Sequence, residues 1–362
     1  MIARAYYLLK PLIPRWAQIA LRRGRARRLW QRNRHCWPIL EEAGAPPAAW
    51  PGWPDGKRFA LVLTHDVELG SGMSRCEQLA DLEEERGFRS AFAFVPLRYR
   101  TPERLRRTLA DRGFEVLVHD LYHDGKLYRD RQTFTQRRPA INEFLRSWQA
   151  RGFASGSMHH NLPWIGELEI DYDISTFDVD PFEPQACGLS RIFPYWVQPP
   201  AGDGRGFVEM PYTLAQDFTL FILLGEQSNA IWRRKLDWIA EKGGMALIKT
   251  HPDYMAFHGD DKRMDRYPVG FYADFLDYVR ARYGDEVWLA HPSEVARYWR
   301  GLAPAGTGGA DAITWQNTFC ATCRQAHRAG WLKHYPAPLT LAGTPPMSME
   351  RTLAGRQMDE RR

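Results

Sequence analysis

The chain has 362 residues, of which 44% are hydrophobic and 25% are charged, a composition typical of globular proteins that excludes a fibrous or largely disordered chain. The length corresponds to about two units of ~150 residues or to one large α/β barrel with tails. The net charge is +6, and no apolar run reaches the ~18–20 residues of a membrane span, so we do not expect an integral membrane protein.

The positive charge is concentrated in an N-terminal arm. Ten Lys and Arg residues and no acidic residue precede Glu41, so the rest of the chain has an excess of acidic residues. Apolar and aromatic residues interleave with the cations over residues 1–35. This pattern is typical of a segment on an anionic membrane surface, and a solvated helix packed on the domain is an equal alternative. We expect no nucleic-acid partner, because no base-reading motif is present.

Composition divides the chain into three regions. Residues 1–55 form the basic amphipathic arm and a Pro/Gly-rich linker, residues 56–300 form the main domain, and residues 301–362 form a poorly ordered C-terminal tail. The arm is too basic and too interrupted by proline for a secretory signal, so we expect a cytoplasmic protein, with the arm as its contact to the inner membrane face. Five scattered cysteines fit a reducing compartment, and Cys320 and Cys323 alone are a weak zinc signal.

Short apolar strands alternate with helices in the main domain. The strands are expected at 59–63, 90–95, 114–118, 245–248 and 287–290, and the helices at 73–87, 102–111, 133–151 and after an N-cap at Ser293. Residues 218–224 are expected in the core. This alternation predicts a mostly parallel sheet or barrel. Ionisable residues follow several strands, at the edge where α/β enzymes place their chemistry.

Three clusters carry the chemistry: Asp66-x-Glu68, His119-x-x-x-His123 and a segment that begins at His251. Two imidazoles four residues apart lie on one side of a turn or helix and can bind one metal ion. A carboxylate from another strand end completes a set of two histidines and one acid, which leaves positions open for water and substrate. The alternative interpretation is a pair of surface histidines in a polar loop.

These motifs resemble those of the polysaccharide deacetylase superfamily, the NodB-homology domain of carbohydrate esterase family 4, over about residues 56–300. The resemblance implies an α/β fold, a distorted (β/α)7-type barrel, and a divalent metal, usually zinc. It implies that Asp66 is the general base, that Glu68, His119 and His123 bind the metal, and that His251 is the general acid.

The chain departs from the family pattern at two motifs. The first motif usually has two adjacent acids, whereas Val67 separates Asp66 from the acid here. The third motif usually has an Arg that orients the base, and the equivalent stretch around Pro163 lacks it. His159, His160 or a distant Arg are the candidate substitutes.

Further site residues are expected around these motifs. The acidic stretch 171–180 lies where the family has an Asp that tunes the acid His; Asp173, Asp178 and Asp180 are the candidates, and we nominate Asp178. Two acids that flank the histidines are expected to orient them or simply to solvate the loop. Four residues are expected to contact substrate, with core packing as the alternative for the aromatic ones. The orienting acids are Asp120 and Asp124, and the substrate contacts are Pro163, Trp164, Asp253 and Tyr254.

The sequence therefore predicts a metal-dependent hydrolase that removes acetyl groups from an N- or O-acetylated polysaccharide or oligosaccharide, in cell-surface or exopolysaccharide metabolism. In this mechanism Asp66 takes a proton from a metal-activated water, and His251 protonates the leaving group. One alternative is a catalytically altered barrel that only binds saccharide. Another is a different metal-dependent hydrolase of C–N bonds on the same fold.

Overall fold

The computed structural model describes residues 14–48, 50–185, 188–198, 206–259 and 263–302. The predicted C-terminal tail beyond Leu302, with Cys320 and Cys323, lies outside these residues. Among the described helices, none combines the length and the apolar character needed to cross a bilayer.

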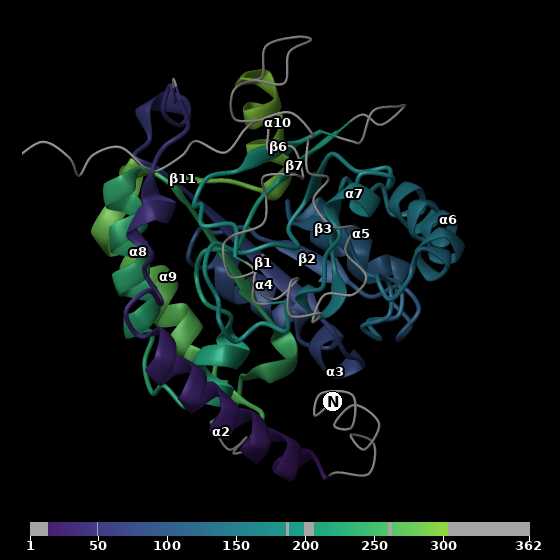
Figure 1. The fold of residues 1–362 in the computed structure, drawn as a ribbon, viewed down its shortest axis with the longest axis horizontal. Coiled ribbons are helices and arrows are strands. Elements are labelled where there is room, and N and C mark those ends of the chain that lie inside the picture. The colour runs from purple at the N-terminus through teal and green to yellow at the C-terminus, as the bar shows by residue number, and fades with distance from the viewer. Residues whose placement is uncertain (1–13, 49, 186–187, 199–205, 260–262, 303–362) are drawn as a thin grey trace, which may run out of the picture.

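The main sheet is a curved wall of mostly parallel strands (Figure 1). β1 pairs with β8 on one side and with β2 on the other, and β3, β4, β5 and β7 follow in parallel order. A bridge between Leu214 and Ile248 joins the segment after β7 to β8. This arrangement is the predicted distorted (β/α)7-type barrel. The strands are β1 (Phe59–Val67), β2 (Ala91–Phe94), β3 (Glu115–His119), β4 (Gly152–Ala154), β5 (Tyr172–Asp173), β6 (Tyr195–Val197), β7 (Phe207–Glu209), β8 (Met245–Thr250), β9 (Met255–Ala256), β10 (Tyr267–Pro268) and β11 (Val287–Leu289).

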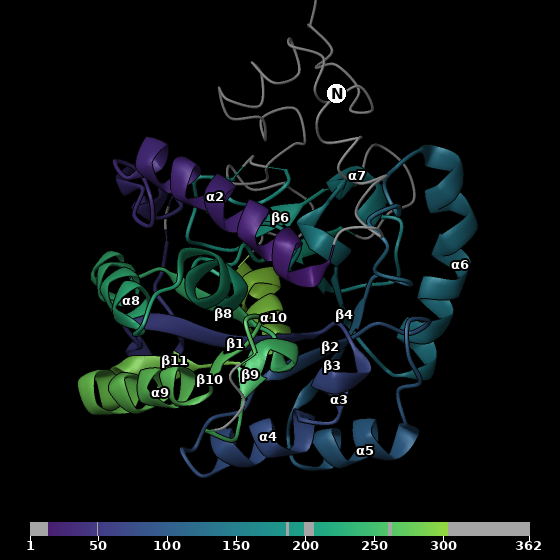
Figure 2. The ribbon, with the colours of Figure 1, turned by 90° about the horizontal axis from the view of Figure 1, so that it is seen from below.

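Helices cover the outside of the sheet. Figure 2 shows α4 and α5 on one side of the molecule and α2 on the opposite side. Between β7 and β8 the chain forms a π-helix, η5 (Phe218–Leu224), and short 3-10 turns connect other elements. The α-helices are α2 (Arg15–Asn33), α3 (Gly70–Met73), α4 (Cys76–Glu84), α5 (Glu103–Asp111), α6 (Arg131–Ser147), α7 (Leu162–Ile165), α8 (Ala230–Lys242), α9 (Gly270–Tyr283) and α10 (Pro292–Leu302).

β1 is the central strand of the barrel. All nine of its residues are buried, as expected for a strand covered on both faces of a parallel sheet. Its C-terminal half runs beside β8 and β2, so that His65 pairs in register with Thr250 and with Phe92. Because parallel strands end at the same edge, β1, β3 and β8 deliver the polar residues that follow them to one place.

The five predicted strands are present as β1, β2, β3, β8 and β11, and the predicted helices as α4, α5, α6 and α10. The prediction for residues 218–224 is also met, because η5 has six of its seven residues buried. The N-cap prediction for Ser293 is wrong, since α10 begins at Pro292. The carboxylate of Glu294 instead accepts a hydrogen bond from the backbone N–H of His291 at 2.8 Å.

Two N-terminal segments pack on the barrel. In α2, Ile19 and Ala26 are buried, and the ring of Phe218 in η5 lies 4.4 Å from the guanidinium of Arg22. In the segment predicted as a linker, Trp53 is 3% exposed, and its indole N–H donates to the carbonyl oxygen of Gly243 at 2.8 Å. Aromatic packing therefore fixes this Pro/Gly-rich stretch to the main domain.

Candidate active site

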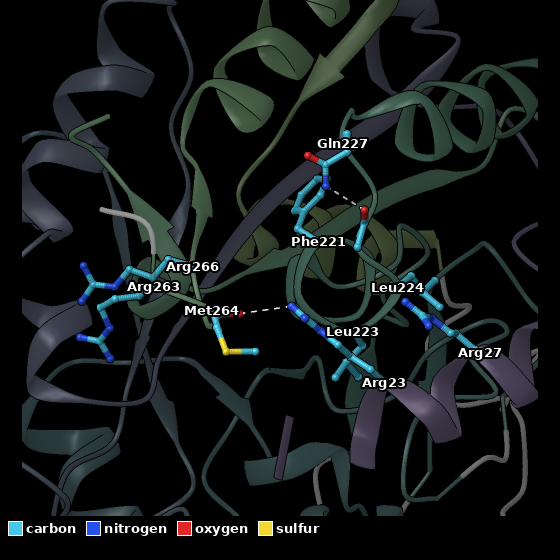
Figure 3. A pocket seen from close by; sticks show the side chains of 10 residues that line it. Arg23, Arg27, Phe221, Leu223, Leu224, Gln227, Arg263, Met264 and Arg266 are labelled. Carbon is cyan, nitrogen blue, oxygen red and sulfur yellow. Dashed lines mark hydrogen bonds between the residues drawn. The ribbon is translucent and has the colours of Figure 1, made fainter. Parts of the chain in front are cut away.

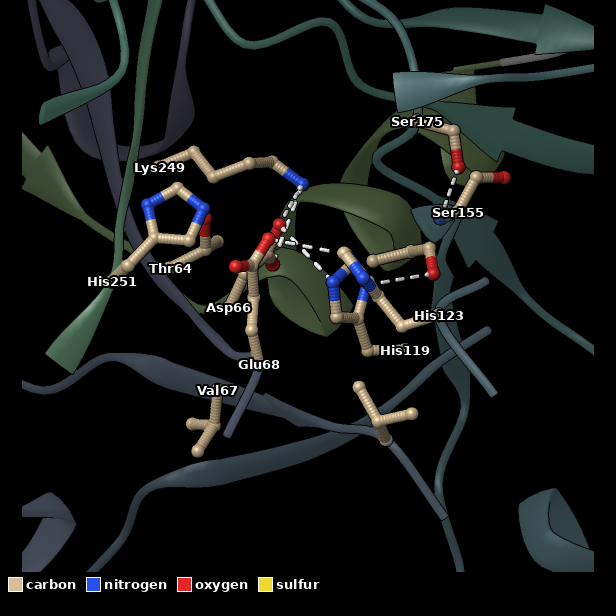
Figure 4. Close-up of polar contacts among 12 residues, drawn as sticks. Thr64, Asp66, Val67, Glu68, His119, His123, Ser155, Ser175, Lys249 and His251 are labelled. Atoms are coloured by element: carbon tan, nitrogen blue, oxygen red, sulfur yellow. Dashed lines mark hydrogen bonds and ion pairs between the residues drawn. The ribbon is translucent and has the colours of Figure 1, made fainter. Parts of the chain in front are cut away.

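The end of β1 places two acids at the mouth of the barrel (Figure 4). Successive side chains of a strand alternate between faces, so Thr64 and Asp66 point to one face and His65 to the other. His65 is fully buried there, where its Nε2 lies 2.7 Å from Oε1 of Glu83 in α4. Glu68 follows directly after the strand. The Asp-x-Glu spacing thus sends both acids of the motif to the same side.

Glu68, His119 and His123 converge. One ligand atom from each lies within 4.8 Å of the other two. The Nε2 atoms of both imidazoles are buried; that of His119 has no hydrogen-bond partner among the described residues, and that of His123 faces the Glu68 carboxylate. The Nε2 of His123 lies 3.1 Å from Oε1 of Glu68. A buried polar nitrogen without a hydrogen-bond partner is costly, so the Nε2 of His119 beside the pair of His123 and Glu68 indicates a place for a cation.

His119 is held in the form that binds a metal. Its Nδ1 lies 3.0 Å from the carbonyl oxygen of Ala154 and donates its proton there, which leaves the lone pair on Nε2. Burial lowers the pKa of His119 to about 4 in spite of the nearby Asp66 carboxylate. The ring is therefore neutral at physiological pH, as ligation requires.

His123 has a different partner. The guanidinium of Arg98 donates to Nδ1 of His123 at 2.7 Å and to its carbonyl oxygen at 3.0 Å. Because arginine cannot accept, the neutral ring in this arrangement carries its proton on Nε2, facing Glu68. Metal binding at Nε2 requires the proton to move to Nδ1, so Arg98 would have to release Nδ1 and keep only its bond to the carbonyl oxygen of His123. Two imidazoles and a carboxylate remain a donor set that suits zinc and similar divalent ions.

Asp66 lies beside this set and is paired with a buried lysine. Its Oδ2 is 3.2 Å from Nζ of Lys249 and 3.8 Å from Nε2 of His119. Burial acts to raise the pKa of Asp66, but His119, Lys249 and His251 outweigh it and hold the pKa below the usual value. Asp66 is thus an ionised carboxylate at neutral pH, available as a proton acceptor.

His251 follows β8 and is held by Asp217. Its Nδ1 lies 2.7 Å from Oδ1 of Asp217, and its backbone N–H donates to Oδ2 at 2.8 Å. Tyr267 donates its hydroxyl to the same Oδ2 at 3.0 Å. Burial acts to lower the pKa of His251, but the Asp217 carboxylate, followed by Glu68 and Asp66, raises it to about 10. The imidazolium is therefore a proton donor at neutral pH.

The expected role of Asp178 needs correction. Asp178 is buried, but its Oδ2 lies 2.5 Å from Nζ of Lys235 in α8, and Lys235 also bonds the carbonyl oxygen of Pro38. The pair ties α8 to the N-terminal segment, and the carboxylate that contacts His251 is Asp217. Within the same acidic stretch, Asp173 bonds Ser175 and Asp180 bonds Tyr212, so neither of them serves His251.

The two acids that flank the histidines lie in different surroundings. Asp120 is buried and accepts from the backbone N–H of Leu121 at 2.7 Å. A Cβ on Gly156 would lie 2.6 Å from Oδ2 of Asp120 and 3.1 Å from the His123 ring, so Asp120 and this ring both pack against Gly156. Asp124, in contrast, forms a two-bond ion pair with Arg137 of α6, both bonds at 2.8 Å.

Asp253 anchors the loop that carries Glu68. Its Oδ2 accepts from the backbone N–H of Glu68 at 2.8 Å, and its Oδ1 accepts from Gly72 at 2.8 Å and from the Ser71 hydroxyl at 3.1 Å. A Cβ at Gly72 would lie 2.4 Å from this carboxylate, so the contact requires glycine there. Both carboxylate oxygens are thus committed within the protein, which argues against the predicted substrate contact.

Tyr254 contacts both His251 and Glu68. Its hydroxyl donates to Oε2 of Glu68 at 2.8 Å, and its ring centroid is 5.2 Å from that of His251. Trp164, in α7 with Pro163, packs instead against Phe134, at 5.6 Å between ring centroids. Tyr254 therefore holds the carboxylate of Glu68 in place, and the contacts seen for Trp164 are those of packing.

Two residues of the candidate site, Lys249 and Asp217, were not predicted from the sequence. Lys249 stands two residues before His251, and strand alternation places both on the inner face, which is a sequence signal that could have identified Lys249. Lys249 contacts Asp66, the role for which the sequence offered His159, His160 or a distant Arg. Asp217 has no local signal, because only the bridge between Leu214 and β8 brings it to His251.

Comparisons with solved structures agree with this fold. A candidate polysaccharide deacetylase from Mycobacterium smegmatis is 22% identical with a TM-score of 0.54, over 71% of this chain and 95% of that one. The Puue allantoinase is 16% identical with a TM-score of 0.56, over 71% and 96%. A candidate polysaccharide deacetylase from Pseudomonas aeruginosa PAO1 is 18% identical with a TM-score of 0.54, over 71% and 96%. No family model and no curated protein sequence matches the chain.

The comparisons establish the fold of the chain. The chain has the polysaccharide deacetylase fold, and the resemblance stated from its motifs is confirmed at that level. The residues that the motifs nominate, Asp66, Glu68, His119, His123 and His251, lie around one mouth of the barrel (Figure 4).

Proposed function

We propose that this protein is a metal-dependent deacetylase of an N- or O-acetylated saccharide. The observation that carries the proposal is the convergence of Glu68, His119 and His123 on one point, with ionised Asp66 and protonated His251 beside it. Removal of an acetyl group needs a base for water, an electrophile for the carbonyl and a proton for the leaving group. This site has a candidate for each.

The ligands in this proposal are the carboxylate of Glu68 and the Nε2 atoms of His119 and His123. Zinc suits a set of two imidazoles and one carboxylate with open positions. The ion, when bound, lowers the pKa of water from 15.7 toward ~7 and polarises the acetyl carbonyl. Tyr254 holds Glu68 in orientation, and the bond from His119 to Ala154 fixes the ring on the other side.

Two charged pairs, Asp66 with Lys249 and His251 with Asp217, carry out the proton transfers. Asp66 accepts the proton of the attacking water, and Lys249 keeps that carboxylate ionised and in place. His251 delivers its proton to the departing sugar nitrogen or oxygen, and Asp217 keeps the imidazole charged until then. Each general acid or base step contributes ~10²–10⁴ to the rate.

The test is release of acetate from a panel of N- and O-acetylated oligosaccharides by zinc-loaded protein. The proposal predicts acetate release that is lost in His119→Ala and Asp66→Asn and kept in His35→Ala, a control at an exposed histidine outside the set. Zinc binding without acetate release, together with saccharide binding, would instead identify a saccharide-binding barrel.

A second candidate is hydrolysis of another C–N bond, which the similarity to the Puue allantoinase fold favours. The same residues would serve that reaction, so the distinction lies in the product. Ring opening of a cyclic amide without acetate release, again lost in His119→Ala, would replace the deacetylase proposal with this one.

A further inference from the structure

A cavity lined by four arginines lies where α2 meets the barrel (Figure 3). Its volume is about 300 Å³, and none of the proposed catalytic residues lines it. Arg23 and Arg27 come from α2, whereas Arg263 and Arg266 come from the segment before β10. No acidic residue lines the cavity. The charge therefore favours an anion, and the volume is at the lower end of the ~300–1,000 Å³ typical of small-molecule sites.

One of the arginines is fixed by the barrel. Arg23 donates from Nε to the carbonyl oxygen of Ile222 at 2.7 Å and from Nη2 to that of Met264 at 3.4 Å. These bonds tie α2 to both walls of the cavity. The nearby acid Asp265 pairs with Arg263 at 3.3 Å, so the four arginines still outnumber the carboxylate at this place.

Exposed aromatic residues lie on the same side of α2 as the cavity arginines Arg23 and Arg27. Trp16, Arg23, Arg27 and Trp30 follow one another at spacings of seven, four and three residues, which places them on one side of a helix. Trp16 is 63% exposed and Trp30 is 46% exposed. Met264, at the cavity, is 49% exposed. Exposed tryptophans beside arginines are typical of a helix at a lipid–water interface.

We propose that this face docks on an anionic membrane, with a phospholipid phosphate in the arginine-lined cavity. A guanidinium group can donate two parallel hydrogen bonds to two oxygens of one phosphate. The exposed Trp16, Trp30 and Met264 would enter the headgroup region beside the cavity. α2 has seven arginines and no acidic residue, which complements a negatively charged surface.

The same docking would bring the candidate active site to the membrane. Arg22 of α2 stacks on Phe218, whose ring centroid is 4.7 Å from that of Tyr254, and Tyr254 bonds Glu68. Three contacts thus connect α2 to Glu68, one of the proposed metal ligands. This consequence rests on the proposed function, whereas the docking itself does not.

The test is cosedimentation of the full-length protein with phosphatidylcholine vesicles that contain or lack phosphatidylglycerol. The variant Arg27→Gln/Arg263→Gln removes two exposed cavity arginines, and Arg104→Gln/Arg107→Gln on the opposite side of the molecule is the matched control (Figure 2). We expect binding only with phosphatidylglycerol, and about 30-fold weaker binding for the cavity variant, because each arginine contributes about 1 kcal/mol at an anionic surface. The control should bind like the wild type.

Equal losses in the two variants would show general electrostatic attraction and overturn the cavity assignment. Equal binding to both vesicle types, or none, would overturn the membrane proposal. Competition with inorganic phosphate at constant ionic strength distinguishes a site for a lipid phosphate from a site for free phosphate. Release of the protein by phosphate at low concentration would show a site for free phosphate and contradict the assignment to a lipid headgroup.

Discussion

The pair of His251 and Asp217 gives the sharpest prediction, through the variant Asp217→Asn. The amide keeps the shape of the carboxylate and an oxygen to accept from Nδ1, but removes the negative charge that raises the pKa of His251 to about 10. Without that charge the pKa falls toward its ordinary value of ~6.5, because burial acts to lower it while Glu68 and Asp66 still act to raise it. The change therefore tests protonation with a side chain of nearly the same shape, although the amide NH₂ replaces Oδ2, which accepts from the backbone N–H of His251 and from Tyr267.

The magnitude follows from the two pKa values. At about pH 8 a histidine with a pKa of about 10 is ~99% protonated, and one with a pKa of ~6.5 is ~3% protonated. If the imidazolium is the general acid and its pKa falls to ~6.5, Asp217→Asn loses about 30-fold in kcat/KM at that pH. The loss shrinks to less than about twofold near pH 6, where both rings are mostly charged.

The assay is the pH profile of acetate release. Wild-type activity should decline only as the pH rises through about 10, and the variant should lose activity several units earlier. The pairing also stabilises the fold: this contribution is complete below pH ~6.5 and is lost as the pH rises through about 10. Identical profiles for the two proteins, at whatever absolute rate, would refute the role of His251 as the acid.

Three further predictions concern the remaining parts of the site. Lys249→Met removes a partner of Asp66 worth ~5 kcal/mol by Coulomb's law at 3.2 Å and an effective dielectric constant of ~20, so Asp66 takes up a proton. Activity at neutral pH should fall ~10²-fold or more and recover at higher pH, whereas Lys249→Arg should retain most of the wild-type activity. An acidic limb of the pH–rate profile that does not shift in Lys249→Met would contradict this role. Asp253→Ala leaves buried backbone N–H groups without acceptors and should lower the free energy of unfolding, measured in urea, by about 3 kcal/mol. The control Asp124→Ala, at a partly exposed ion pair, should lower it by less than ~1 kcal/mol. Equal losses in the two variants would contradict the role of Asp253 as an anchor. Zinc at ~100 times its Kd should stabilise the wild type by ~2.7 kcal/mol in thermal unfolding and leave His123→Ala unchanged; equal stabilisation would place the ion elsewhere.

The fold could be predicted from the sequence where the pattern was strong. Phe59–Val67 and Met245–Thr250 are long buried runs, and helices such as Arg131–Ser147 have clear periodicity. Tyr172–Asp173 and Phe207–Glu209 were not predicted. These strands are two or three residues long and do not stand in a continuous apolar run as Val287–Leu289 does, so the barrel around them sets their conformation.

The candidate site was predictable to the extent that it follows strand ends. Asp66, His119 and His251 all stand at or directly after a strand, so a parallel topology brings them together. Asp217 was not predictable, because it precedes a π-helix and reaches His251 only through a tertiary bridge. Asp253 stands two residues after His251, and no sequence pattern shows that its carboxylate caps α3 instead of facing substrate.

The central claim is that Glu68, His119 and His123 hold one divalent ion. Elemental analysis of purified protein after dialysis against zinc tests it directly, with His119→Ala/His123→Ala as the variant and His35→Ala as the control at an exposed histidine. The account predicts one tightly held ion per chain in the wild type and the control, and none in the double variant. Retention of that ion by the double variant would contradict it.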